Sequence, residues 1–147
     1  MKFMIDNKIV FLDTNILVYA WEKEESERKE KSKKILEKCY KNKIILAISN
    51  QNIAEFSSVA IKKIKIDPNI VKKVIDNISK FNGFIKLKYE IETIKSAINL
   101  SIEYKMSFWD SLIAATMIEN GILNIYTENS KDFKIPQLNV VNPFCEK

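Results

Sequence analysis

Two acidic residues stand alone in apolar stretches of this sequence. Asp110 is the one charged residue of "SFWDSLIAATM" (107–117), and Asp13 lies between two hydrophobic runs in "KIVFLDTNILVYAW" (8–21). An ionised carboxylate in apolar surroundings is costly unless it is paired, hydrogen-bonded or bound to a metal. Because both residues share this feature, a common carboxylate site is the first hypothesis.

Two features of the composition narrow the chemistry that such a site could perform. The sequence has no histidine, which excludes Ser-His-Asp hydrolases, Cys-His nucleophiles and histidine-based ribonucleases. It has two glycines, too few for a P-loop or a Gly-x-Gly-x-x-Gly dinucleotide turn. An enzyme of this composition must therefore rely on carboxylates, with or without a metal ion.

Length and composition are those of one globular domain, residues 1–147. Cys39 and Cys145 have no zinc-motif spacing and are expected to be reduced thiols. No apolar run approaches the ~20 residues of a membrane span, and the first residues lack a signal-peptide pattern, so we expect a cytoplasmic protein away from membranes. The net charge of +5 is a weak indication of a polyanionic partner.

The elements that must position these acids alternate along the chain. Short apolar runs typical of buried strands occur at 9–12, 44–49, 84–88, 122–126 and 138–141. Helix-capping residues and helical spacing predict helices that begin near residues 14, 26, 50, 67, 90 and 107. This alternation predicts an α/β fold, a three-layer sandwich with a mainly parallel central sheet of about five strands. Ligands of such sheets bind beyond the carboxyl ends of the strands, where Asp13 and the polar loop 127–133 are expected.

Two of these helices are apolar in different ways. In the helix expected at 90–104, the apolar residues at helical spacing are Ile91, Ile94, Ala97, Ile98 and Ile102. The helix after Ser107 is apolar on nearly every side, which predicts that it is buried.

Each acid has a simpler structural interpretation. Asp13 can be a helix cap, and Asp110, third after the Ser107 cap, can interact with the positive end of the helix dipole. Glu55 can be an exposed helix residue, and Asp132 a loop residue. For the four acids taken together this structural interpretation is weaker, because a buried helix is an unfavourable place for a charge that only caps it.

Four segments together resemble a known family. In order and spacing, "FLDTNILVYA", "SNQNIAEF", "MSFWDSLIAATMIENG" and "IYTENSKDF" resemble the four motif blocks of PIN-domain nucleases, in particular the VapC-type toxins of bacterial and archaeal toxin–antitoxin pairs. The resemblance spans essentially the whole chain and implies a single PIN-like domain. It assigns Asp13, Glu55 and Asp110 to the family's acidic cluster. Asn129 stands where many members carry an acid, although the later Asp-Phe pair is kept at Asp132.

The chemistry of such a cluster fits a hard divalent cation. Carboxylates held close together repel one another, and oxygen ligands select Mg²⁺ or Mn²⁺. We therefore expect Asp13 and Asp110 to bind the metal directly, and Glu55 to bind it through water or to orient the attacking water. Asp132 is expected to be an outer ligand. Hydrogen-bonding neighbours are expected at Thr14, Asn15, Thr127 and Asn129.

The resulting prediction is a Mg²⁺- or Mn²⁺-dependent endoribonuclease, the toxin of a toxin–antitoxin module. The resemblance implies cleavage that leaves 5′-phosphate and 3′-hydroxyl ends. Expected partners are an RNA substrate, a cognate antitoxin protein and, if the chain dimerises, a second copy. The basic residues between two predicted helices are expected on a solvated face, with RNA phosphate binding as the alternative: Lys62, Lys63, Lys65, Lys72 and Lys73.

Three other functions stay open at this stage. The chain could be a housekeeping RNA-processing nuclease of the same fold, or an RNA-binding module that has lost activity. It could also be a phosphatase-like α/β hydrolase of small phosphoesters. That last function calls for an Asp-x-Asp pair after the first strand, and "DTN" supplies a single Asp.

Overall fold

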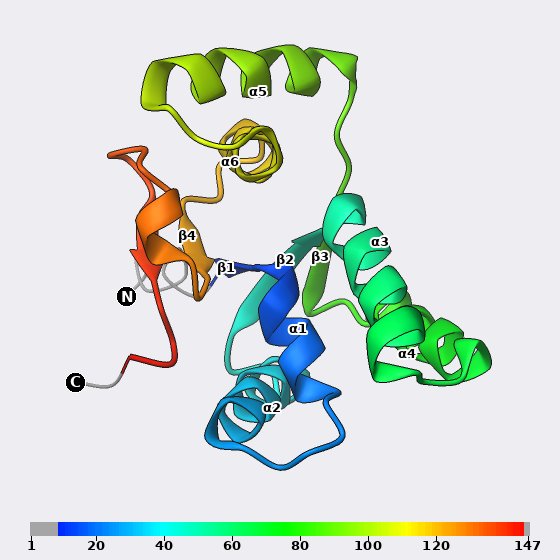
Figure 1. Ribbon diagram of the computed structural model, residues 1–147. Coiled ribbons are helices and arrows are strands. Elements are labelled where there is room, and N and C mark those ends of the chain that lie inside the picture. The colour runs from blue at the N-terminus through cyan, green and yellow to red at the C-terminus, as the bar shows by residue number, and fades with distance from the viewer. Residues whose placement is uncertain (1–8, 146–147) are drawn as a thin grey trace.

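A five-stranded parallel sheet forms the centre of the protein (Figure 1). The computed structural model describes residues 9–145. The strands are β1 (Ile9–Leu12), β2 (Ile45–Ser49), β3 (Phe84–Leu87), β4 (Asn124–Tyr126) and β5 (Asn139–Val141). They lie in the order β3-β2-β1-β4-β5, and every neighbouring pair is parallel. The α/β prediction with about five strands is confirmed, and the sheet is wholly parallel.

Helices cover both faces of this sheet. Among residues 9–145 the α-helices are α1 (Thr14–Ala20), α2 (Glu27–Tyr40), α3 (Asn50–Val59), α4 (Pro68–Lys80), α5 (Ile91–Tyr104) and α6 (Phe108–Glu119). A π-helical turn, η2 (Ala60–Ile64), extends α3, and a 3-10 turn, η3 (Ser130–Asp132), follows β4. In Figure 1, α5 and α6 lie on one side of the sheet and α1 to α4 on the other, which gives the three predicted layers. None of the helices in this described range is long and apolar enough to cross a membrane.

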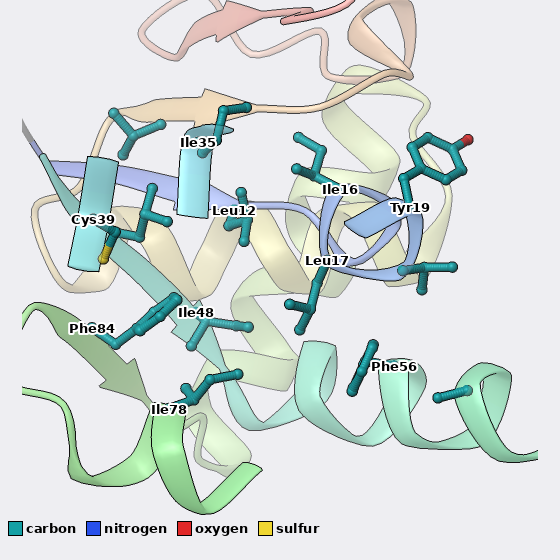
Figure 2. Packing of buried hydrophobic residues seen from close by; sticks show 14 of the residues in the cluster. Leu12, Ile16, Leu17, Tyr19, Ile35, Cys39, Ile48, Phe56, Ile78 and Phe84 are labelled. Atoms are coloured by element: carbon teal, nitrogen blue, oxygen red, sulfur yellow. The ribbon is translucent and has the colours of Figure 1, made fainter. Parts of the chain in front are cut away.

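Alternate residues of the inner strands contribute to two separate cores. On β1, Val10 and Leu12 belong to the core beneath α1 to α4, whereas Phe11 belongs to the core beneath α6. Figure 2 shows the first core, which Leu12 shares with Ile16 of α1 and Phe56 of α3. Because a parallel strand between two helical layers is covered on both faces, its residues are apolar in both directions.

Helix α6 is buried on nearly every side, as the sequence predicts. Every residue from 111 to 117 is buried. Ser107 caps the helix, and its hydroxyl oxygen accepts a hydrogen bond from the backbone N–H of Asp110 at 3.2 Å. Asp110 is therefore carried by an element whose position is set by core packing.

Helix α5 lies where the sequence predicts a helix, but several of its large apolar residues are exposed. Its buried residues are Thr93 and Ala97, whereas Ile91, Ile98 and Ile102 are 75%, 46% and 71% exposed. In Figure 1, α5 lies outside α6 rather than against the sheet. The side chains of α5 that pack against the cores include Ala97, Ile94 and Leu100. The predicted helix is present, but helical spacing identifies an apolar stripe and not the element that covers it.

Candidate active site

The strand order reverses between β1 and β4, and a polar residue follows each of these strands. From β1 the sheet extends through β2 to β3 on one side, and through β4 to β5 on the other. Asp13 follows β1, Thr127 follows β4, and the Thr127 hydroxyl donates a hydrogen bond to Asp13 Oδ2 at 2.7 Å. The carboxyl ends of strands at such a reversal are where α/β sheets bind ligands. This edge of the sheet is therefore a candidate site.

Asp13 is both a helix cap and a buried carboxylate. Its Oδ1 accepts a hydrogen bond from the backbone N–H of Thr14 at 2.8 Å, which caps α1. Its own N–H donates to the carbonyl of Tyr126 on β4 at 3.1 Å. The side chain is 8% exposed. The local geometry of Asp13 therefore fits both a helix cap and a residue of a carboxylate site. The residues around it decide between these two roles.

Glu55 reaches the same edge from α3. Its Oε1 accepts a hydrogen bond from the Thr14 hydroxyl at 2.6 Å. The Thr14 oxygen in turn accepts one from Nδ2 of Asn52 at 2.8 Å, and Asn52 forms a reciprocal capping box with Ser49 at the start of α3. A chain of polar side chains therefore runs from the end of β2, through the start of α1, to the Glu55 carboxylate.

The four predicted acids act on one another electrostatically. Burial raises the pKa of Asp13 above its ordinary value, and the charges of Asp110 and Glu55 raise it further, while the hydrogen bonds to its oxygens oppose this rise. Burial is also the largest cause of the raised pKa of Asp110, to which the charges of Asp132 and Glu55 add. The charges of these carboxylates, which come from four separate segments, thus act on Asp13 or Asp110, and we call the four residues the acidic cluster.

The loop after β4 carries the remaining predicted residues. Asp132 lies in η3 and is exposed, and its N–H donates to the carbonyl of Asn129 at 2.9 Å. The backbone N–H of Asn129 donates to the Thr127 hydroxyl oxygen at 3.1 Å. Asn15, the second residue of α1, follows Asp13 and Thr14 in the sequence and is partly exposed. Thr14 and Thr127 are thus hydrogen-bonded to the acids, whereas Asn129 contacts the cluster through its backbone.

The donor atoms of the cluster fit a hard divalent cation. They are carboxylate oxygens, the type that Mg²⁺ and Mn²⁺ prefer. A cation would favour the ionised forms of Asp13 and Asp110, which burial and then charge repulsion disfavour. Within residues 9–145, no three His, Cys, Asp or Glu side chains are grouped as a ready-made metal site. The Glu55 carboxylate is instead engaged by the Thr14 hydroxyl and the Gln51 amide. This arrangement suits a role of Glu55 through water better than direct ligation.

Sequence reasoning missed two polar residues beside Glu55. Asn52 supports Thr14, and the amide of Gln51 contacts Glu55. Local spacing could have indicated both. Ser49 and Asn52 have the separation of a capping box, and Gln51 precedes Glu55 by one helical turn, so that the two share a face of α3.

Fold and cluster together define an α/β protein with an acidic site at the carboxyl edge of a parallel sheet. Residues 10–136 match the PIN domain family, and the chain belongs to that family. A search of curated proteins gave no match.

Several solved structures share this fold. In a toxin–antitoxin complex from Klebsiella pneumoniae, a chain is 25% identical with a TM-score of 0.67, covering 92% of this chain and 98% of that one. A chain of VapBC2 from Rickettsia felis, bound to a promoter DNA fragment, is 25% identical with a TM-score of 0.65, covering 91% of this chain and 98% of that one. VapC20 from Mycobacterium tuberculosis, a toxin that cleaves the sarcin–ricin loop, is 15% identical with a TM-score of 0.64, covering 86% of this chain and 96% of that one. At this identity the likeness is one of fold alone.

Proposed function

We propose that this chain is a divalent-metal-dependent endoribonuclease, the toxin of a toxin–antitoxin pair, built as one PIN domain over residues 1–147. The observation that carries the proposal is the burial of Asp13 beside the charges of Asp110 and Glu55. A helix cap needs one carboxylate and gains nothing from two more beside it. The PIN-domain match and the toxin–antitoxin neighbours support a nuclease of this type.

Asp13 and Asp110 are the residues that would hold Mg²⁺ or Mn²⁺, with Asp132 as an outer ligand. When bound, the metal ion lowers the pKa of a water and offsets the charge that develops on the phosphate and on the leaving oxygen. The protein prepares the Asp13 carboxylate through the Thr127 hydroxyl and the Thr14 N–H, which occupy one oxygen each. These two donors hold the side chain in one orientation.

Glu55 orients the attacking water and accepts its proton. The Thr14 hydroxyl holds one of its oxygens, so the carboxylate enters the reaction in a fixed position. The water oxygen forms a bond to phosphorus while the bond from phosphorus to the 3′ oxygen breaks, and the leaving 3′ oxygen takes up a proton from solvent. The products carry a 5′-phosphate and a 3′-hydroxyl.

Cleavage of a defined single-stranded RNA tests the nuclease function. We expect cleavage with Mg²⁺ or Mn²⁺, no cleavage with excess EDTA, and 5′-phosphate ends on the products. Undiminished cleavage in EDTA would exclude the mechanism. RNA binding without cleavage under every condition would favour the inactive binding module. Hydrolysis of p-nitrophenyl phosphate without cleavage of RNA would favour the small-phosphoester hydrolase.

Expression in a bacterium tests the toxin assignment. Synthesis of the chain in the cytoplasm without a partner should arrest the growth of the cells, and Asp13→Ala should relieve the arrest. An antitoxin is expected to block the acidic cluster, with an Arg or Lys side chain reaching the carboxylates. Equal arrest by wild type and variant would remove the nuclease explanation, and a harmless wild type would favour the housekeeping nuclease.

A further inference from the structure

The side chain of Gln51 is buried but not satisfied. This second residue of α3 is 6% exposed. Its Nε2 lies 3.4 Å from Oε2 of Glu55 and 3.4 Å from the carbonyl oxygen of Trp109. Its Oε1 is buried and has no hydrogen-bond partner among the described residues. Because both neighbours of Nε2 are acceptors, the amide cannot be turned around to pair Oε1 without losing them.

Gln51 connects two helices that carry acids of the cluster. Glu55 lies one turn further along α3, and Trp109 immediately precedes Asp110 in α6. The other oxygen of Glu55 accepts the hydrogen bond from Thr14. The Glu55 carboxylate therefore has one donor on each oxygen, which restrains its rotation. Of these donors, Gln51 is the one that also contacts the first turn of α6.

Stability alone does not account for a glutamine at this position. A buried carbonyl oxygen without a partner is less favourable than an apolar side chain of the same length. Methionine would occupy a similar volume without that penalty. A side chain that lowers stability beside an active site is typical of a functional constraint.

We infer that Gln51 is a positioning residue of the acidic cluster, which holds Glu55 in place relative to Asp110. The inference rests on the proposed nuclease function, since positioning matters when Glu55 orients the attacking water. Gln51 acts through Glu55 and needs no contact with RNA or with a metal ion.

Gln51→Met tests this role against Gln137→Met, the same change at the only other glutamine of the sequence, which is exposed. Without metal, Gln51→Met should melt at the wild-type temperature or above it. On single-stranded RNA with Mn²⁺ its kcat should fall about tenfold or more with little change in KM, as losses around metal-site ligands typically do. Its melting temperature should also rise less when Mn²⁺ is added. Gln137→Met should match wild type in all three measurements.

Gln51→Glu separates positioning from packing. It keeps the shape of the side chain, but the ionised form has no donor for Glu55, so its kcat should fall as well. Wild-type kcat and Mn²⁺ response in both variants would overturn the inference. So would a strongly destabilised Gln51→Met combined with a fully active Gln51→Glu, which would make Gln51 a packing residue. If wild type cleaves no RNA at all, the proposed function fails, and the Mn²⁺-dependent melting shift still decides whether Gln51 acts on the cluster.

Discussion

Two aspartates of this protein have the same local role in different surroundings. Asp13 caps α1 and Asp67 caps α4, and each accepts a hydrogen bond of 2.8 Å from a backbone N–H, of Thr14 and Asn69 respectively. Asp67 is exposed to solvent. Asp13 is buried and accepts a second hydrogen bond from the Thr127 hydroxyl. The backbone at the two helix starts therefore does not distinguish these residues.

The difference between them lies in burial and in neighbouring charge. Burial, Asp110 and Glu55 all raise the pKa of Asp13, so its ionised form is disfavoured where it lies. Asp67 caps its helix from the solvent side, followed by a proline that fits the first turn. A helix cap can therefore also be a buried carboxylate beside other acids. Burial beside other acids is what distinguishes Asp13 from Asp67.

The largest expected effect comes from replacing each of these caps by asparagine. Asparagine caps helices as well as aspartate, so both helix starts should persist. If Asp13 is a metal ligand, as proposed, Asp13→Asn removes a contact that supplies several kcal/mol to the transition state, and cleavage should fall about a thousandfold. Asp67→Asn should stay within about twofold of wild type, because exposed sites away from the reaction contribute little. Initial rates on one RNA at saturating Mn²⁺ measure both. Equal losses at the two positions, or none at either, would reduce Asp13 to a cap.

The next effect is a change of stability with pH in Asp110→Asn. Because burial, Asp132 and Glu55 raise the pKa of Asp110, the folded wild type binds this proton more tightly than the unfolded chain does. The stability that this proton contributes is fully present below the pKa of Asp110 in the unfolded chain, about 3.9. It is lost as pH rises through the raised pKa of Asp110 in the folded protein. Relative to wild type, the non-titrating variant should therefore gain stability as pH rises through this window.

Denaturant unfolding in EDTA over a pH series measures this difference. If Asp110 only interacts with the helix dipole, the variant should instead be less stable at neutral pH by about 0.3–1 kcal/mol, and fully active. Added Mn²⁺ should stabilise wild type more than Asp110→Asn, because ligand binding to the folded state adds to stability. The variant should also lose cleavage.

Local sequence signals single out two of the acids but do not predict the hydrogen bonds around them. Asp13 and Asp110 stand out because strands, caps and apolar helices are encoded by neighbouring residues. The hydrogen bond from Thr14 to Glu55 joins residues 41 positions apart and depends on how α1 packs against α3. The Gln51 contact with the Trp109 carbonyl spans 58 positions and depends on α3 and α6 in the same way. No local pattern contains that information.

The isoleucines of α5 show the same limit in the opposite direction. Their spacing correctly predicts a helix with an apolar stripe. The covered face is formed by the buried Thr93 and Ala97, with Ile94 and Leu100 packed beside them, while Ile91, Ile98 and Ile102 are exposed. A stripe of large apolar residues is therefore evidence for a helix but not for the side that is buried.

The smallest expected effect is that of Asp132→Asn, which extends the comparison to an exposed acid at the edge of the cluster. Asp132 is exposed, yet its charge raises the pKa of Asp110. The variant should lower that pKa and move the acidic limb of the pH–rate profile to lower pH. Cleavage at saturating Mn²⁺ should fall about tenfold at most, with a higher Mn²⁺ requirement, and stability should change by less than about 0.5 kcal/mol. Asp76→Asn, at an exposed acid of α4 near Lys80, is the matched control and should shift neither profile. A loss at Asp132 as large as that at Asp13 would make it a direct ligand and would show that exposure does not rank the acids of this site.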